Sequence, residues 1–238
     1  MNKYLLKLLD EGTINDCKII KKVIDARILE YEVVINSVIE TKNPRIIYKT
    51  ALNTAKENDI PRLADAICET NDALHIYYFA IDVIYAPIDK LADAICKTNN
   101  ANYIYKFAYM VDGAPIDKLA DAICQTDHDV YIKDFILNIK KINKNSKNNL
   151  VDALIRLKSI KGLEEIINAN TIKNETDILN KIKYGLLECQ SSIIKYQSLI
   201  NTANNGSDDL KFFSEIYKEL LGVNDKKGKL KIKELKSE

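Results

Sequence analysis

The sequence predicts an all-α protein on the strength of two observations. The first is composition: the 238 residues include only seven glycines and four prolines, so residues that break helices are few. The second is a repeat, because "LADAIC" begins at Leu63, Leu91 and Leu119, at intervals of 28 residues. A unit of this length accommodates two short helices, which bury their apolar residues only against neighbouring units.

The repeat extends in both directions beyond these three copies. "VINSVIETKNPRIIYKTA" at 34–51 fits the same frame on the N-terminal side, and "LVDALIRLKSIKGLEEII" at 150–167 fits it more loosely on the C-terminal side. About five units therefore run from near residue 30 to near residue 168. We expect them to stack as an α-solenoid of helical hairpins with capping helices at both ends.

Each unit is predicted to form two helices joined by tight turns. In the central copy the residues expected to be buried follow helical spacing, namely Leu91, Ala94, Ile95, Ile104, Phe107, Ala108 and Val111. Asn99 or Asn100 is suited to cap the second helix, and Gly113 to adopt the left-handed conformation that ends it. Pro115 then suits the opening of the next helix, and Asp117 favours its positive end.

The unit resembles the helical hairpins of the HEAT, armadillo and tetratricopeptide class. Those repeats are longer, about 33–47 residues, and none of their signature residues occurs here. The unit is also similar to short helical repeat arrays of low-GC bacteria and their phages, and the abundance of Ile, Lys and Asn suits such a source. The resemblance covers about residues 30–168 and implies a stacked array with a binding role. It carries over no functional residue.

The predicted organisation has five segments. They are N-terminal capping helices at 1–29, the repeat array at 30–141, a polar linker or loop at 142–149, a degenerate repeat with further helices at 150–222, and a basic flexible tail at 223–238. The linker is predicted from "KKINKNSKNN" at 140–149, which has four lysines and no acidic residue.

Charge and cysteine usage narrow the function classes. The net charge is +1, from 35 basic and 34 acidic residues, so no global field attracts nucleic acid or an anionic membrane. No apolar run approaches the roughly 18–20 residues that span a bilayer. Five cysteines, an odd number, without a secretory signal favour free thiols in a reducing compartment. We therefore expect a cytoplasmic protein without a membrane partner.

Two columns of equivalent residues invite a metal or acid–base interpretation. The cysteines Cys68, Cys96 and Cys124 would lie roughly 8–10 Å apart in stacked units, too far for one zinc ion or a disulfide. The acidic column is Asp65, Asp93, Asp121 and Asp152. It is predicted to face solvent in ion pairs with the basic residues three positions earlier, Arg62, Lys90 and Lys118. With no catalytic or phosphate-binding motif, the sequence predicts a non-enzyme without metal or cofactor.

The second helix of each unit carries the most informative pattern, because tyrosine recurs at its predicted outward positions. The candidate partner-binding residues are Arg45, Tyr48, Lys49, Tyr77, Tyr78, Asn102, Tyr105, Lys106, Tyr109 and Lys133. Tyrosines among charges are typical of protein-binding grooves, since they combine large contact area with a polar tip. The alternative is that each tyrosine packs across the seam onto the next unit.

The predicted function is a non-catalytic protein-binding module, an adaptor or inhibitor encoded by a phage or mobile element. Its concave surface would present the tyrosines and lysines to a partner protein. The alternative is a nucleic-acid-binding helical-repeat protein, in which tyrosines stack on bases. Its phosphate contacts would come from Lys49, Lys106, Lys133, Lys140, Lys141, Lys144 and Lys147.

Overall fold

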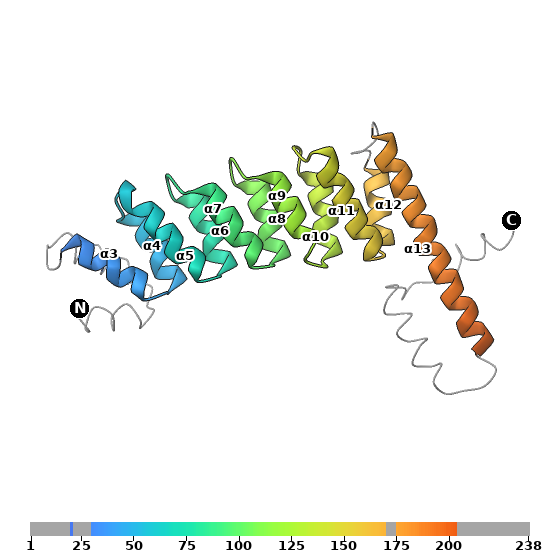
Figure 1. The fold of residues 1–238 in the computed structure, drawn as a ribbon, viewed down its shortest axis with the longest axis horizontal. Coiled ribbons are helices and arrows are strands. Elements are labelled where there is room, and N and C mark those ends of the chain that lie inside the picture. The colour runs from blue at the N-terminus through green and yellow to red at the C-terminus, as the bar shows by residue number, and fades with distance from the viewer. Residues whose placement is uncertain (1–19, 21–29, 170–174, 204–238) are drawn as a thin grey trace. The chain divides into compact units, whose positions relative to one another are not determined.

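The computed structural model describes Ile20, residues 30–169 and residues 175–203, and Figure 1 shows their arrangement. These residues contain helices and no strand, which confirms the all-α prediction for this part of the chain. The helices are α3 (Tyr31–Glu40), α4 (Pro44–Asn53), α5 (Ile60–Glu69), α6 (Ala73–Asp82), α7 (Ile88–Lys97), α8 (Ala101–Met110), α9 (Ile116–Ile123), α10 (Asp129–Asn138), α11 (Lys144–Arg156), α12 (Ile160–Asn168) and α13 (Thr176–Ala203), with a 3₁₀ turn at Glu57–Asp59 before α5. Almost all of the predicted segment 1–29 and the tail 223–238 lie outside the described residues.

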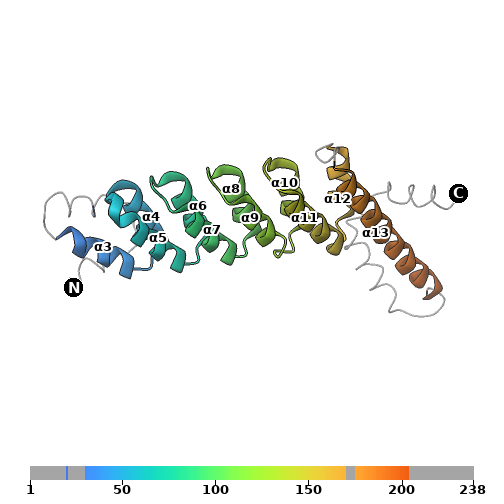
Figure 2. The ribbon, with the colours of Figure 1, turned by 45° about the horizontal axis from the view of Figure 1, so that its top comes forward.

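Each helix from α3 to α12 contacts the next helix of the chain, and helices at equivalent positions of the repeat also contact each other. In the repeat frame of the sequence they group into the pairs α3 with α4, α5 with α6, α7 with α8, α9 with α10, and α11 with α12. The second helices α4, α6, α8, α10 and α12 are in contact in that order, as are the first helices α5, α7, α9 and α11. Figures 1 and 2 show these two rows of helices. Two helices thus fall within each of the five units expected from the sequence.

The chain divides into two compact units, residues 1–182 and residues 183–238, and the division falls within α13. The first unit contains all of the helix pairs. In the second unit the structure describes the continuation of α13, on which Tyr184 and Leu187 are exposed and Cys189 is buried.

The core of the first unit repeats with the sequence. Every residue predicted to be buried in the central copy is at most 7% exposed, which confirms that part of the prediction. Phe79, Phe107 and Phe135 occupy equivalent positions in α6, α8 and α10, and all three are fully buried. Leu63, Leu91 and Leu119 occupy equivalent positions in the first helices α5, α7 and α9 and are also fully buried. These three units therefore contribute the same apolar layer to the core.

The turns follow from asparagine and glycine chemistry. Asn100 caps α8, since its side-chain oxygen accepts a hydrogen bond from the backbone N–H of Tyr103 at 3.3 Å. Asn99 has a positive φ of 51°, the left-handed conformation that closes α7. Gly113 has the predicted positive φ, 76°. The structure thus assigns separate roles to the two asparagines that the sequence offered as alternative caps.

The segment 142–149 differs from the predicted linker, because α11 begins at Lys144. Asn143 caps this helix by accepting a hydrogen bond from the backbone N–H of Ser146 at 2.7 Å. Ser146 is buried, and Lys144 pairs with Asp177 on α13 at 2.6 Å, so the polar stretch makes specific contacts. The lysines and asparagines of this segment predict a loop, but in the structure they form the exposed side and the cap of α11.

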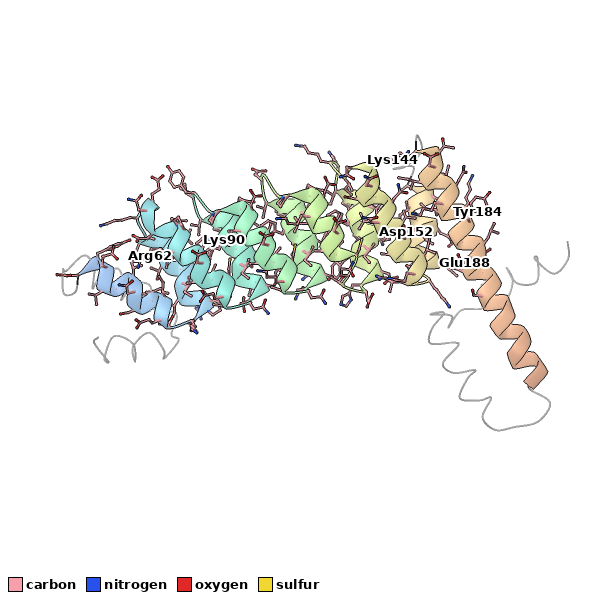
Figure 3. All side chains as sticks on the ribbon, viewed as in Figure 1. Arg62, Lys90, Lys144, Asp152, Tyr184 and Glu188 are labelled. Carbon is pink, nitrogen blue, oxygen red and sulfur yellow. The ribbon has the colours of Figure 1, made fainter. Side chains whose placement is uncertain are left out.

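The ion pairs of the first-helix row also differ from the prediction. Lys118 on α9 reaches Asp93 on α7, with 2.6 Å between Nζ and Oδ1, and Lys90 on α7 contacts Asp65 on α5. Each lysine therefore bridges to the preceding unit, and the predicted pairs within one helix are wrong. Lysine side chains lean towards the N-terminal end of their own helix, away from an aspartate three residues later. Figure 3 shows Arg62 and Lys90 in this row.

Candidate functional site

One side of the second helices carries all ten candidate residues, and we call it the second-helix face. Four positions of each helix form it, at spacings of i, i+3, i+4 and i+7, which share one side of a helix. Its members are Arg45, Tyr48, Lys49 and Leu52 on α4; Leu74, Tyr77, Tyr78 and Ile81 on α6; Asn102, Tyr105, Lys106 and Tyr109 on α8; and Val130, Lys133, Asp134 and Leu137 on α10. Contacts between these four helices bring the positions side by side.

Aromatic rings connect the helices of this face. The ring centroids of Tyr48 on α4 and Tyr78 on α6 are 6.0 Å apart in a stacked arrangement. Tyr77 on α6 and Tyr103 on α8 are 5.8 Å apart. Tyr105 on α8 continues the series to α10, where its ring lies 6.2 Å from that of Tyr131. The tyrosines thus pack across the seams between units, and some of them also remain exposed.

Tyr48 is the clearest departure from the predicted exposed row, because it is only 7% exposed. Tyr78 and His75 of α6 lie against its ring, and its hydroxyl donates a hydrogen bond to Asp82. Burial, followed by that hydrogen bond, raises the pKa of the Tyr48 hydroxyl well above its usual value. Tyr48 therefore follows the packing alternative. Tyr77 and Tyr105 are half-buried.

Lys133 forms ion pairs with two neighbouring carboxylates. Its Nζ lies 2.7 Å from Glu165 on α12 and 3.2 Å from Asp134, and its side chain is largely covered. The hydrogen bond to Glu165 is the main cause that raises the pKa of Lys133 above its usual value. Lys133 thus joins α10 to α12 and offers little charge to a ligand.

The exposed part of the second-helix face is mainly apolar and aromatic, which the tyrosine pattern alone does not show. Among its apolar and aromatic side chains the most exposed are Tyr109 at 58%, Val130 at 57% and Tyr78 at 41%. One apolar column runs through equivalent positions of the four helices: Leu52, Ile81, Tyr109 and Leu137. The sequence analysis missed the three aliphatic members. The sequence pattern that indicates such residues is a second apolar stripe on α6, opposite the stripe that contains Phe79.

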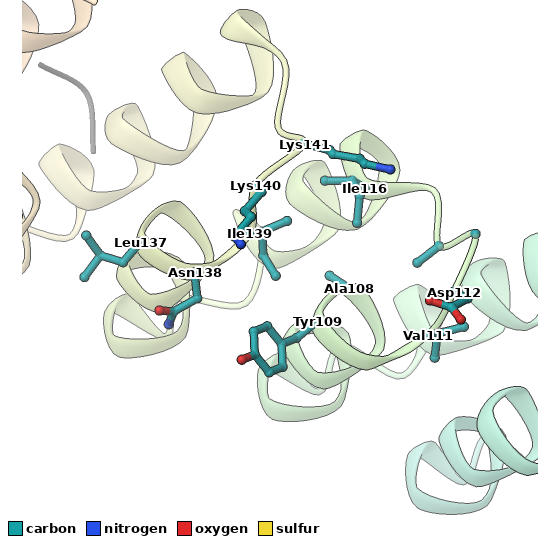
Figure 4. A pocket seen from close by; sticks show the side chains of 12 residues that line it. Ala108, Tyr109, Val111, Asp112, Ile116, Leu137, Asn138, Ile139, Lys140 and Lys141 are labelled. Atoms are coloured by element: carbon teal, nitrogen blue, oxygen red, sulfur yellow. The ribbon is translucent and has the colours of Figure 1, made fainter. Parts of the chain in front are cut away.

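A cavity of about 760 Å³ opens next to this column, between the ends of α8 and α10 (Figure 4). Tyr109 and Leu137 belong to the column and also line the cavity. The other lining residues are Ala108, Val111, Asp112, Gly113, Ala114, Ile116, Asn138, Ile139, Lys140 and Lys141. Its volume is in the range of sites that receive a ligand group or a partner side chain.

Positive charges outnumber negative charges around the second-helix face. Five cations have no carboxylate within ion-pair distance among the described residues: Arg45, Lys49, Lys106, Lys140 and Lys141. Of the carboxylates nearby, Asp134 is paired with Lys133, whereas Asp82 accepts a hydrogen bond from the neutral Tyr48 hydroxyl and keeps its negative charge. Asp112 is the one exposed carboxylate at the cavity. The region therefore carries excess positive charge although the chain as a whole is nearly neutral.

The cysteine and aspartate columns do not form a reactive site in the described part of the chain. No group of three or more His, Cys, Asp or Glu residues there has the geometry to hold a metal ion. Burial, followed by the charge of a nearby aspartate, raises the pKa of Cys68 and Cys96 to about 11 and of Cys124 to about 12. These thiols are therefore protonated at neutral pH and are poor nucleophiles.

We expect these three cysteines to be alkylated at least about tenfold more slowly in the folded protein than in urea, since a raised pKa lowers the thiolate fraction more than it increases the nucleophilicity of the thiolate. Iodoacetamide labelling near neutral pH, followed by peptide mass spectrometry, measures each cysteine separately. A rate for Cys96 in the folded protein equal to that in urea would contradict this assignment.

No protein-family model, curated protein or solved structure matches the chain. No helix in the described part of the chain combines the length and hydropathy needed to cross a bilayer. The functional argument therefore depends on the second-helix face itself.

Proposed function

We propose that the protein is a cytoplasmic, non-catalytic α-solenoid that binds a partner protein through the second-helix face, as an adaptor or an inhibitor. The repeated helix pairs would be the rigid scaffold, with the second helices on its concave side. The start of α13 would cap the array, because Ile178 and Ile182 are fully buried and Lys181 pairs with Asp152 on α11 at 2.6 Å.

The observation that carries this proposal is the exposed apolar and aromatic stripe on successive second helices. On α6 all four positions of the face are apolar or aromatic, Leu74, Tyr77, Tyr78 and Ile81, although the opposite side of α6 already supplies the core. Tyr77 and Tyr78 also pack across the seams, but Leu74, Tyr78 and Ile81 remain 36%, 41% and 40% exposed. Clustered exposed apolar side chains with charges at their edge are typical of protein interaction sites.

The same observations disfavour nucleic acid as the partner. Three of the seven lysines expected to contact phosphates are paired with carboxylates instead: Lys133 with Glu165, Lys144 with Asp177 and Lys147 with Glu175. Tyr48 and Tyr105 stack on tyrosines within the face, so those ring surfaces are already in use. Aliphatic side chains such as Ile81 give no advantage on a phosphate backbone.

Affinity capture from the cells in which the protein is native tests the proposal. The full chain is immobilised as wild type and as the double variant Tyr78→Ala/Tyr109→Ala, and the retained proteins are quantified by mass spectrometry. We expect at least one protein to be retained by the wild type and to decrease about tenfold or more on the variant, because exposed tyrosines dominate such interfaces. Retention should change little with salt.

The matched control is Tyr184→Ala/Leu187→Ala, which removes two large side chains that lie outside the face and are more exposed than Tyr78 and Tyr109. It should retain the partner as the wild type does. Capture of nucleic acid alone, or of proteins that both double variants retain equally, would contradict the proposal. Circular dichroism of each variant verifies that the helices are intact.

A further inference from the structure

We infer that the occupant of the second-helix face is an amphipathic α-helix that has apolar side chains every seventh residue and acidic residues beside them. This inference rests on the proposed function and specifies its partner. Three independent features of the face support it: the spacing of its apolar column, the state of its backbone and the excess of positive charge.

The spacing sets the period of the partner. The column Leu52, Ile81, Tyr109 and Leu137 takes one side chain from each of four helices in contact. Packed helices are about 8–10 Å apart, and a helix rises about 1.5 Å per residue. A partner helix lying along the column would therefore meet a new column residue about every five to seven residues, and a spacing of about seven, close to two turns, keeps these contacts on one side of its surface. Contact with all four would take about 16–20 residues.

The backbone of the face favours a helix over an extended segment. Residues of the column lie within α4, α6, α8 and α10, whose N–H and C=O groups are used inside those helices. The face thus offers no free strand edge that would pair with an extended backbone. A helix satisfies its own backbone groups and presents only side chains, which is what this face can receive.

Charge complementarity indicates acidic residues on the partner. Lys49 and Lys106 lie beside the column on α4 and α8, where their Nζ atoms are 4.9 Å and 5.1 Å from the ring centroids of Tyr48 and Tyr103. Lys140 and Lys141 stand at the cavity beside Tyr109, and both are exposed. Carboxylates on the partner would pair with these cations, while an apolar side chain enters the cavity.

Selection from a phage-displayed library of helical peptides, each of about 21 residues with randomised surface positions, tests the inference. The full chain is the bait, and the face variant Ile81→Asp/Tyr109→Asp is the counter-selection. We expect enriched peptides with apolar residues at i, i+7 and i+14 and with Asp or Glu beside them. Their affinity should fall at least tenfold on the face variant and also on Lys106→Glu/Lys141→Glu, and stay unchanged on Tyr184→Asp/Leu187→Asp.

The outcomes of the selection distinguish failure of the acidic-helix inference from failure of the protein-binding function. Enriched peptides that require the face but are basic, or contain proline and bind extended, would overturn the acidic helix and leave the protein-binding function standing. Peptides that bind the face variant as well as the wild type, or no enrichment at all, would count against both. Tight binding of single-stranded oligonucleotide by the same face would also overturn both.

Discussion

Replacing Phe107 with alanine is expected to lower the free energy of unfolding by about 3–5 kcal/mol. The side chain is fully buried in the middle of α8, and the equivalent Phe79 and Phe135 are buried in the neighbouring units. Truncation would therefore leave a cavity in the centre of a repeated core, where helices on both sides hold their positions and prevent collapse. Urea denaturation followed by circular dichroism measures the change.

Met110→Ala is the matched control, because Met110 lies one turn further along the same helix but is 56% exposed. It should alter stability by less than about 0.5 kcal/mol. In a stacked array, loss of the Phe107 side chain should also weaken the energetic coupling between the units on either side of it. The unfolding transition should therefore broaden. Equal effects of Phe107→Ala and Met110→Ala would show that the phenylalanines are not the centre of the core.

The repeat made the helices, the core and several turns predictable. Residues that recur at the same position, such as Leu91 and Phe107, do so because every unit must bury the same layer. The caps were predictable from local chemistry: the Asn100 side chain accepts a backbone hydrogen bond at the start of α8, and Gly113 adopts a positive φ that few other residues adopt as easily. Local chemistry and periodicity together were sufficient for this part of the structure.

Partners across the seams were not predictable in the same way. Lys90 had two aspartates within reach, one in its own helix and one in the preceding unit, and only the packing of the helices decides between them. Tyr48 and Tyr77 are equivalent in the sequence, yet Tyr48 alone is fully covered, because residues of α6 close over it. The candidate site was therefore predicted as a set of positions, whereas the exposure of aliphatic members such as Ile81 follows only from the packing of the helices.

Replacing Asp59 with alanine is expected to lower the free energy of unfolding by about 2 kcal/mol. Asp59 is 5% exposed at the start of α5, where it accepts a hydrogen bond from the Tyr31 hydroxyl at 2.8 Å and pairs with Arg62 at 3.1 Å. It joins α3 to α5, and the next two units have Pro87 and Pro115 at the equivalent position, so they lack this carboxylate. Its loss would leave the Tyr31 hydroxyl without its acceptor.

Asp59→Asn separates the two contributions, because an amide oxygen still accepts from Tyr31 but carries no charge for Arg62. We expect it to cost less than Asp59→Ala, and Arg62→Ala to cost less again, since the arginine is largely exposed. Equal stability of Asp59→Ala and the wild type in urea would contradict the assignment.

The dependence of stability on pH gives the Asp59 contact a second signature. Burial, together with the hydrogen bond and the charge of Asp59, raises the pKa of Tyr31 from 10.0 to about 12, although the Lys56 backbone N–H partly opposes the rise. The unfolded chain loses this proton first, so the contribution of Tyr31 to the free energy of unfolding is complete below pH 10 and declines as the pH rises towards 12. Asp59→Ala removes two of the causes that raise the pKa. The decline should therefore be shallower in the variant, which chemical denaturation at a series of alkaline pH values would show.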